Sequence, residues 1–130
     1  MDTYAEVIMT GESPGSNFGF SVSAAGDVNG DGYSDVVVGS NSLSKAYVYL
    51  GSPVMNNTAD VILNGDGTSW NFGVSVSSAG DINGDGYSDI IVGSNNNNTN
   101  TYTGQAFIYY GSLFMNNIPD ITLNGESTNN

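Results

Sequence analysis

The chain contains the nine-residue string DVNGDGYSD at residues 27–35, followed by VVVG at residues 36–39. The string recurs with one substitution as DINGDGYSD at residues 81–89, followed by IIVG at residues 90–93. Each copy places oxygen-bearing side chains at its first, third, fifth and ninth positions and a glycine at its sixth. This spacing predicts a calcium-binding loop, because calcium takes about six to eight oxygen ligands and glycine permits the sharp turn that gathers them.

Each predicted loop would hold one Ca²⁺, giving two ions per chain. Three carboxylates so close together would repel one another strongly without a cation. The tyrosine at the seventh position would contribute its backbone carbonyl, which leaves its ring free to pack elsewhere. The expected metal ligands are Asp27, Asn29, Asp31, Tyr33 and Asp35 in the first loop, and Asp81, Asn83, Asp85, Tyr87 and Asp89 in the second.

The residues after each loop decide which class of calcium module this is. EF-hands and dockerin-like modules continue into a helix and usually carry an acidic ligand at position 12. Position 12 here is Val38 in one copy and Val92 in the other. An unbroken β-branched run closed by glycine predicts a buried strand. The loops therefore lead into β-structure, which argues against the helical modules.

The duplication extends over most of the chain. Asn17–Gly19 recurs 54 residues later, and Ala46–Ser52 matches a segment 60 residues later. The six extra residues fall in the Asn- and Thr-rich stretch 95–103, which indicates a surface loop. No window has helical periodicity. The expected strands are 18–25, 35–40, 45–50 and 60–64 in the first unit, 72–79, 89–94, 105–110 and 119–124 in the second, and 4–10 as a ninth.

Four short strands in a repeat of this length predict an all-β fold of two four-stranded antiparallel β-propeller blades. We expect residues 12–65 to form the first blade and residues 66–125 the second. Residues 1–11 would be an outer strand of an incomplete or neighbouring blade, and residues 126–130 a tail. The third strand of each unit should direct aromatic side chains to one face and aliphatic side chains to the other.

These motifs together resemble the FG-GAP repeat of integrin α-subunit head domains. The resemblance covers nearly the whole chain, with one departure: Gly39-Ser40-Asn41 stands where the family has Gly-Ala-Pro. It implies a propeller of usually about seven blades, structural calcium in the loops, and a role in cell adhesion at the cell surface. The matching elements are Phe18-Gly19, Gly26-Asp27, Val38-Gly39 and the aromatic strand ending at Gly51, with Phe72-Gly73, Gly80-Asp81, Val92-Gly93 and the strand ending at Gly111 in the second unit.

Two blades cannot close a ring, because propellers need roughly 4–8. The chain is therefore expected either to be cut from a larger propeller or to complete a ring as a homo-oligomer. A trimer would supply six blades and a tetramer eight. The initiating Met1 without a signal sequence, and the close match of the two units, are typical of an excised or engineered repeat.

The charge and composition of the chain limit the kinds of partner that it is expected to bind. The net charge is −12, from 13 acidic residues against the single base Lys45. Such a chain is not expected to bind nucleic acid or anionic membranes, which need Lys and Arg. No apolar run approaches the length of a transmembrane helix, so no membrane insertion is expected. The Asn-, Thr-, Ser- and Gly-rich composition, with calcium loops and no cysteine, favours an extracellular origin.

The leading hypothesis is a non-catalytic, calcium-stabilised scaffold or interaction module with a protein or glycan ligand. The absence of His and Cys from the sequence excludes His-dependent triads and Cys nucleophiles, and most clustered acids are already assigned to calcium. The alternative is a lectin-like module, in which Trp70 or Tyr102 stacks on a sugar beside the polar loop 95–101.

Overall fold

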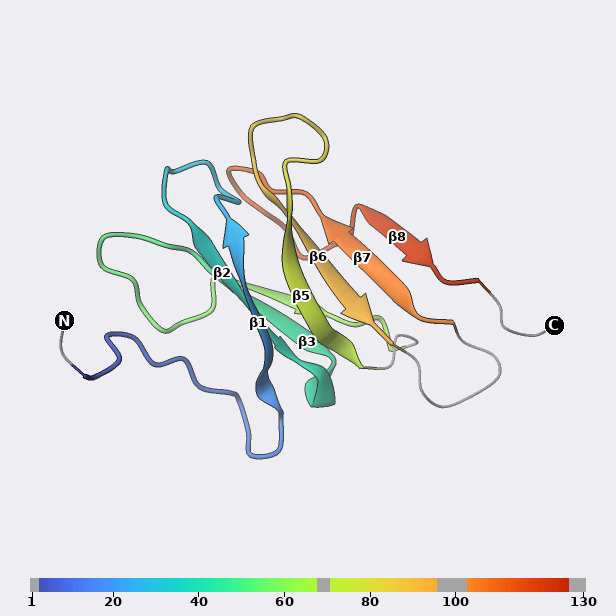
Figure 1. Ribbon diagram of the computed structural model, residues 1–130, viewed down its shortest axis with the longest axis horizontal. Helices are drawn as coiled ribbons and strands as arrows, with labels where there is room; N and C mark the ends of the chain where they lie inside the picture. Colours follow the sequence, from blue (N-terminus) through green and yellow to red (C-terminus); the bar gives the residue numbers. More distant parts are fainter. Residues whose placement is uncertain (1–2, 68–70, 96–102, 127–130) are drawn as a thin grey trace.

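A computed structural model describes residues 3–67, 71–95 and 103–126 (Figure 1). Within these ranges the chain forms eight β-strands and one short 3-10 turn at Asn41–Leu43. Each of the eight strands expected between residues 18 and 124 is found, with ends that differ by at most two residues. They are β1 (Phe18–Gly26), β2 (Asp35–Ser40), β3 (Lys45–Tyr49), β4 (Val61–Asn64), β5 (Phe72–Gly80), β6 (Asp89–Ser94), β7 (Gln105–Tyr109) and β8 (Ile121–Asn124).

The strands form two separate sheets, each in simple chain order. The first sheet is β1-β2-β3-β4 and the second is β5-β6-β7-β8, and every neighbouring pair is antiparallel. This confirms the prediction of two four-stranded antiparallel sheets. In the part of the chain that the structure describes, no helix is long and apolar enough to cross a membrane.

The Phe-Gly motif lies at an irregularity in the first strand of each sheet. The pairing of β1 with β2 shifts between Phe18 and Ser21, and the pairing of β5 with β6 shifts at the equivalent place. Gly19 and Gly73, within these shifts, have φ angles of +88° and +90°. A residue with a Cβ resists this conformation. The repeated glycine is therefore required by the β-bulge that starts each sheet.

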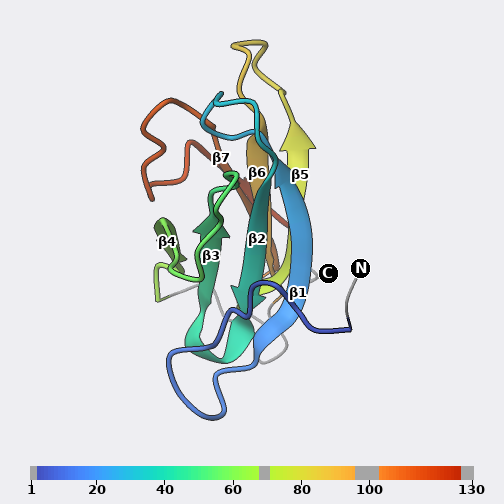
Figure 2. The same cartoon turned by 90° about the vertical axis from the view of Figure 1, so that its left-hand side faces the viewer.

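The main core lies between the two sheets, which pack with one face against the other (Figures 1 and 2). Val37, Val48 and Leu63 of the first sheet are fully buried there. They pack against buried residues of the second sheet that include Phe72 and Phe107. Burying a side chain of this size contributes roughly 1.5–3 kcal/mol, so this shared core holds the sheets together.

The two faces of β3 differ as the sequence predicts. Ala46 and Val48 belong to the core between the sheets, whereas Tyr47 and Tyr49 form a second cluster on the opposite face of the first sheet. The Tyr47 ring meets the Phe18 ring edge to face, with centroids 5.3 Å apart. Each sheet thus has one aromatic and one aliphatic face, and the aromatic face of the second sheet packs on the aliphatic face of the first.

Residues 4–10 form no strand, although the sequence analysis expects one there. A strand needs a hydrogen-bonded neighbour, and the described residues provide no third sheet on this side of the molecule. The segment runs instead along the aromatic face of the first sheet. There Met9 packs against the cluster that contains Phe18 and Tyr47.

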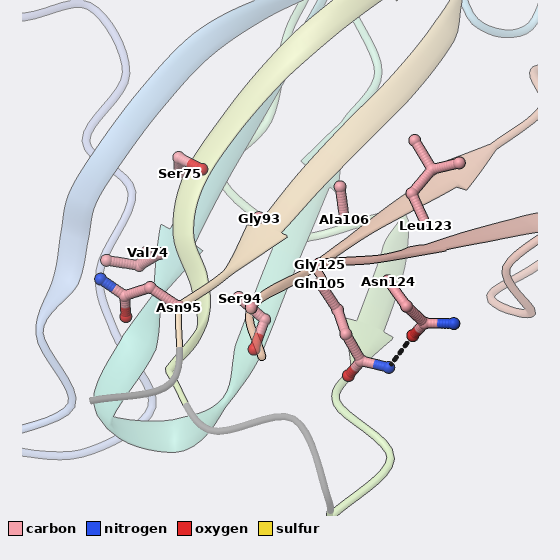
Figure 3. A pocket seen from close by; sticks show the side chains of 11 residues that line it. Val74, Ser75, Gly93, Ser94, Asn95, Gln105, Ala106, Leu123, Asn124 and Gly125 are labelled. Carbon is pink, nitrogen blue, oxygen red and sulfur yellow. Dashed lines mark hydrogen bonds between the residues drawn. The ribbon is translucent and has the colours of Figure 1, made fainter. Parts of the chain in front are cut away.

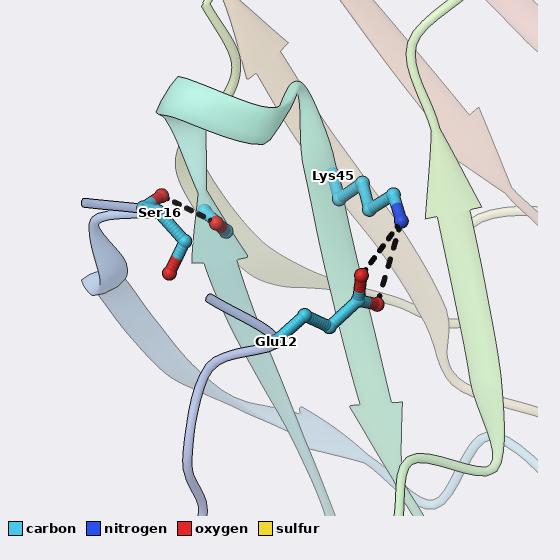
Figure 4. Close-up of polar contacts among 4 residues, drawn as sticks. Glu12, Ser16 and Lys45 are labelled. Carbon is cyan, nitrogen blue, oxygen red and sulfur yellow. Dashed lines mark hydrogen bonds and ion pairs between the residues drawn. The ribbon is translucent and has the colours of Figure 1, made fainter. Parts of the chain in front are cut away.

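The segment that leads into β1 is held by polar contacts (Figure 4). Glu12 pairs with Lys45 of β3 at 3.0 Å. The Ser40 hydroxyl donates to the carbonyl oxygen of Ser16 at 2.6 Å and is fully buried. These contacts fix the entry to β1 from the end of the sheet opposite the predicted calcium loops.

Candidate calcium loops

Both nine-residue loops connect the first and second strands of a sheet, and both lie at the same end of the molecule, at the top of Figure 1. In the first loop the carboxylate of Asp27 closes the turn. Its Oδ1 accepts the backbone N–H groups of Gly30 (2.8 Å) and Asp31 (3.1 Å), and its Oδ2 accepts that of Gly32 (2.8 Å). The first position of the motif therefore organises the loop around one carboxylate.

The second loop repeats this arrangement with nearly the same distances. Asp81 accepts the N–H groups of Gly84 (2.9 Å), Asp85 (3.1 Å) and Gly86 (2.8 Å). The N–H of Gly86, followed by the other two, lowers the pKa of the Asp81 carboxyl from its ordinary value. Hydrogen bonds to the charged form favour that form, so Asp81 is ionised at neutral pH and suited to a cation.

The third and fifth positions are brought together beside the first. The Asn29 amide donates to Asp31 Oδ2 at 3.1 Å, and Asp31 Oδ1 accepts the N–H of Tyr33 at 3.0 Å. The Asn29 Oδ1 atom is buried and has no hydrogen-bond partner. A buried acceptor without a partner costs free energy, and a bound cation would relieve that cost. The Asn29 Oδ1 atom is therefore the feature of this loop that fits a metal ligand.

The ninth position has a different environment. Asp35 is fully buried, and its two oxygens accept the N–H groups of Val28 (2.7 Å) and Gly51 (2.8 Å). Burial raises the pKa of the Asp35 carboxyl, and the two hydrogen bonds oppose that rise. Asp89 makes the equivalent bonds to Ile82 (2.7 Å) and Gly111 (2.9 Å).

The position-9 carboxylates therefore tie the base of each loop to the end of the third strand. Each carboxylate oxygen has a second lone pair, so a metal-binding role for Asp35 and Asp89 stays a prediction. The described residues contain no group of three or more acidic side chains placed to hold a metal ion. The structure thus gathers Asp27, Asn29 and Asp31, while Asp35 is directed to the backbone.

Sequence reasoning missed the part that Gly51 and Gly111 play in the loops. A Cβ on Gly51 would overlap the carbonyl oxygen of Ser34, and a Cβ on Gly111 would overlap that of Ser88. The repeated glycine after each aromatic strand was the available signal. It allows the third strand to approach the loop closely enough for the glycine N–H to reach the aspartate.

The rings of the two tyrosines at the seventh position lie in different environments. Tyr33 is exposed, whereas Tyr87 lies over the first loop, where a Cβ added to Gly30 would come within 2.7 Å of its Cε1 atom. The metal-binding role of their carbonyls stays a prediction. The sugar-stacking candidates Trp70 and Tyr102, with most of the loop 95–101, lie outside the described residues, so the lectin alternative also stays a prediction.

Each sheet has four antiparallel strands in chain order, which is the construction of a β-propeller blade. A family model described as an FG-GAP-like repeat matches residues 27–92. The chain is 37% identical to integrin alpha-6 of Gallus gallus over 133 residues, covering 95% of this chain and 12% of the relative. It is 35% identical to integrin alpha-PS3 of Drosophila melanogaster over 113 residues, covering 81% and 10%. The chain belongs to the FG-GAP repeat family and spans about a tenth of the length of these relatives.

Proposed function

We propose that this chain is a calcium-binding, non-catalytic scaffold or interaction module of an extracellular β-propeller. The observation that carries the proposal is the unpartnered, buried Asn29 Oδ1 inside a loop whose first and fifth residues are aspartates. Carboxylate and amide oxygens are the ligands that calcium prefers. The repetition of the same loop in the second blade supports one ion per blade, two per chain.

In the first loop, Asp27, Asn29, Asp31 and Asp35 would hold the ion with the carbonyl of Tyr33. In the second loop the ligands would be Asp81, Asn83, Asp85, Asp89 and the carbonyl of Tyr87. Bound Ca²⁺ supplies positive charge that offsets the repulsion among the carboxylates. The hydrogen bonds around Asp27 and Asp81 already give each loop its turned shape, so binding would stiffen the loop rather than refold it.

The scaffold role is favoured over catalysis by the chemistry of the side chains. The sequence has no His or Cys, and the clustered aspartates are engaged with backbone N–H groups in the loops. A carboxylate held in this way is a poor proton shuttle. Extracellular fluid, with its high free calcium, is the compartment in which such sites would be filled.

The test is the melting temperature in millimolar CaCl₂ and in excess chelator, with isothermal titration calorimetry for stoichiometry. We expect calcium to raise the melting temperature and to bind at two sites. Asp31→Asn should reduce the rise and remove one site, whereas the exposed Glu6→Gln, which also loses one negative charge, should change neither. Equal melting temperatures in calcium and chelator, with no binding heat, would overturn the proposal.

A further inference from the structure

Among the residues that the structure describes, nothing packs over the aliphatic face of the second sheet. A groove of about 440 Å³ runs along that face beside the end of β8, lined by residues that include Ser75, Gly93, Ala106 and Leu123 (Figure 3). Leu123 is 49% exposed. An aliphatic side chain in this setting is what a packing partner would cover.

The aliphatic face of the first sheet is the repeat counterpart of this groove, and within the chain it is covered by the second sheet. Ser21, Gly39, Ala46 and Leu63 are the repeat counterparts of the four groove residues. Ala46 and Leu63 are fully buried there against the second sheet. The chain therefore already contains one filled copy of this surface.

The filled copy is occupied by the Phe-Gly segment of β5. The Ser21 hydroxyl donates to the carbonyl oxygen of Gly73 at 2.8 Å, and a Cβ on Gly39 would overlap that same carbonyl. In the open copy, Ser75 Oγ makes no such bond among the described residues. Ser21 and Gly39 thus form a binding site for the backbone of a Phe-Gly segment. Ser75 and Gly93, the equivalent pair in the second blade, contact no such segment among the described residues.

The first blade has its own Phe-Gly segment, Phe18-Gly19, and no other blade packs against it among the described residues. Gly19 of β1 has the same positive φ as Gly73. A Cβ on Gly73 would overlap the carbonyl oxygen of Lys45, whereas a Cβ on Gly19 would meet nothing within 4 Å. Val22 is 66% exposed, while its counterpart Val76, buried between the sheets, is only 9% exposed.

We propose that the groove of one chain binds the first blade of a second copy, in the manner in which the first blade binds the second within each chain. The carbonyl oxygen of Gly19 in the second copy would accept a hydrogen bond from the Ser75 hydroxyl, and Val22 of that copy would be covered. The two surfaces differ, so the contact is heterologous and leads to a closed ring or to an open chain. Closed rings of three or four copies would have six or eight blades.

The N-terminal segment must move for this contact to form. Met9 packs on the aromatic face of the first sheet, beside Phe18, as Leu63 packs on that of the second sheet beside Phe72. In the assembly Leu123 of the neighbouring copy takes the place of Met9. We expect Leu123 to displace the N-terminal segment because Leu123 is held in a strand, β8, which pairs with β7 at four positions. Residues 4–10 form no strand and are held less firmly.

The experiment measures solution mass by light scattering on a sizing column, in moderate salt, with calcium and with chelator. We expect the wild type to have the mass of several chains. Val22→Asp, which disables the β1 surface, and Leu123→Asp, which disables the groove, should each have the mass of one chain. The control Phe114→Asp changes an equally apolar residue that is 87% exposed and outside the groove, and should assemble like the wild type.

Mixing the two disabled variants gives the sharpest outcome. Each retains the surface that the other lacks, so an equimolar mixture should form a species of two chains that grows no further. A wild type of one chain at high concentration, variants that still assemble, or a mixture that stays at one chain would each overturn the proposal. Val22 is exposed, so V22D tests the contact even if L123D fails to fold.

Discussion

The backbone N–H of Ser88, in the second loop, donates to the carbonyl oxygen of Asp27, the first residue of the first loop, at 3.0 Å. This bond crosses from one blade to the other. Beside it, the Tyr87 ring lies over Gly30 of the first loop. The first loop is therefore braced by the second blade, whereas the second loop has no such neighbour among the described residues.

The bracing predicts unequal roles for the two loop tyrosines. Tyr87→Ala should destabilise the chain by about 1–2 kcal/mol, because it removes a half-buried ring from the first loop. Tyr33→Ala, at the equivalent position, should change stability by less than about 0.5 kcal/mol, because that ring is exposed. Urea unfolding followed by far-UV circular dichroism measures both. Equal losses would show that Tyr87 does not brace the first loop.

Asp35 should stabilise the chain even when calcium is absent. Asp35→Ala leaves the N–H groups of Val28 and Gly51 buried without an acceptor, at a cost of about 2–4 kcal/mol. The measurement is urea unfolding in excess chelator, with the exposed Asp31→Ala as control. If Asp35→Ala lost stability only in calcium, the carboxylate would act through the metal alone.

The interface between the blades should tolerate no side chain at Gly39. Gly39→Ala places a methyl group onto the Gly73 carbonyl, and overpacking of this kind costs roughly 1–3 kcal/mol. Gly93→Ala makes the same change in the second blade, where the added methyl meets the Ser75 hydroxyl and, among the described residues, no backbone of a facing blade. We expect a loss below about 1 kcal/mol there. Thermal unfolding of the two variants in a dilute, unassembled sample gives the comparison.

Stability should fall in alkaline solution. Burial, and after it the nearby Glu12 carboxylate, raise the pKa of the Tyr47 hydroxyl to about 12 from an ordinary value of 10.0. Between these values the folded state keeps a proton that the unfolded state has lost. The contribution of the protonated Tyr47 hydroxyl to the free energy of unfolding is therefore fully present below pH 10 and is lost as the pH rises through about 12.

Replacing Tyr47 by phenylalanine should weaken that pH dependence. Phe107 occupies the equivalent position in the second blade and is buried against Phe72, which shows that the ring fits without its hydroxyl. Urea unfolding of the wild type and of Tyr47→Phe between pH 9 and 12 measures the two slopes. Identical slopes would mean that another group causes the alkaline loss.

The sequence by itself determined the strands, the loops and the number of blades. A run such as Val36–Gly39 after an Asp- and Gly-rich loop specifies a turn and a buried strand through local geometry alone, and the repeat specifies that this happens twice. The faces of β3 follow from the alternation of Ala46, Tyr47, Val48 and Tyr49. Residues 4–10 show the limit, because they pair with no strand among the described residues and Met9 packs instead on the face of the first sheet.

Only the tertiary structure decided what the repeated residues do. Asn29 and Asn83 occupy local sequences that differ only at Val28 and Ile82, yet Asn29 Oδ1 is buried and unpartnered while Asn83 is exposed. Leu63 is fully buried and Leu123 is 49% exposed for the same reason. Covalent spacing sets the shape of a loop or strand, whereas burial depends on what packs against it, and here the second blade covers the first while its own outer face has no described neighbour.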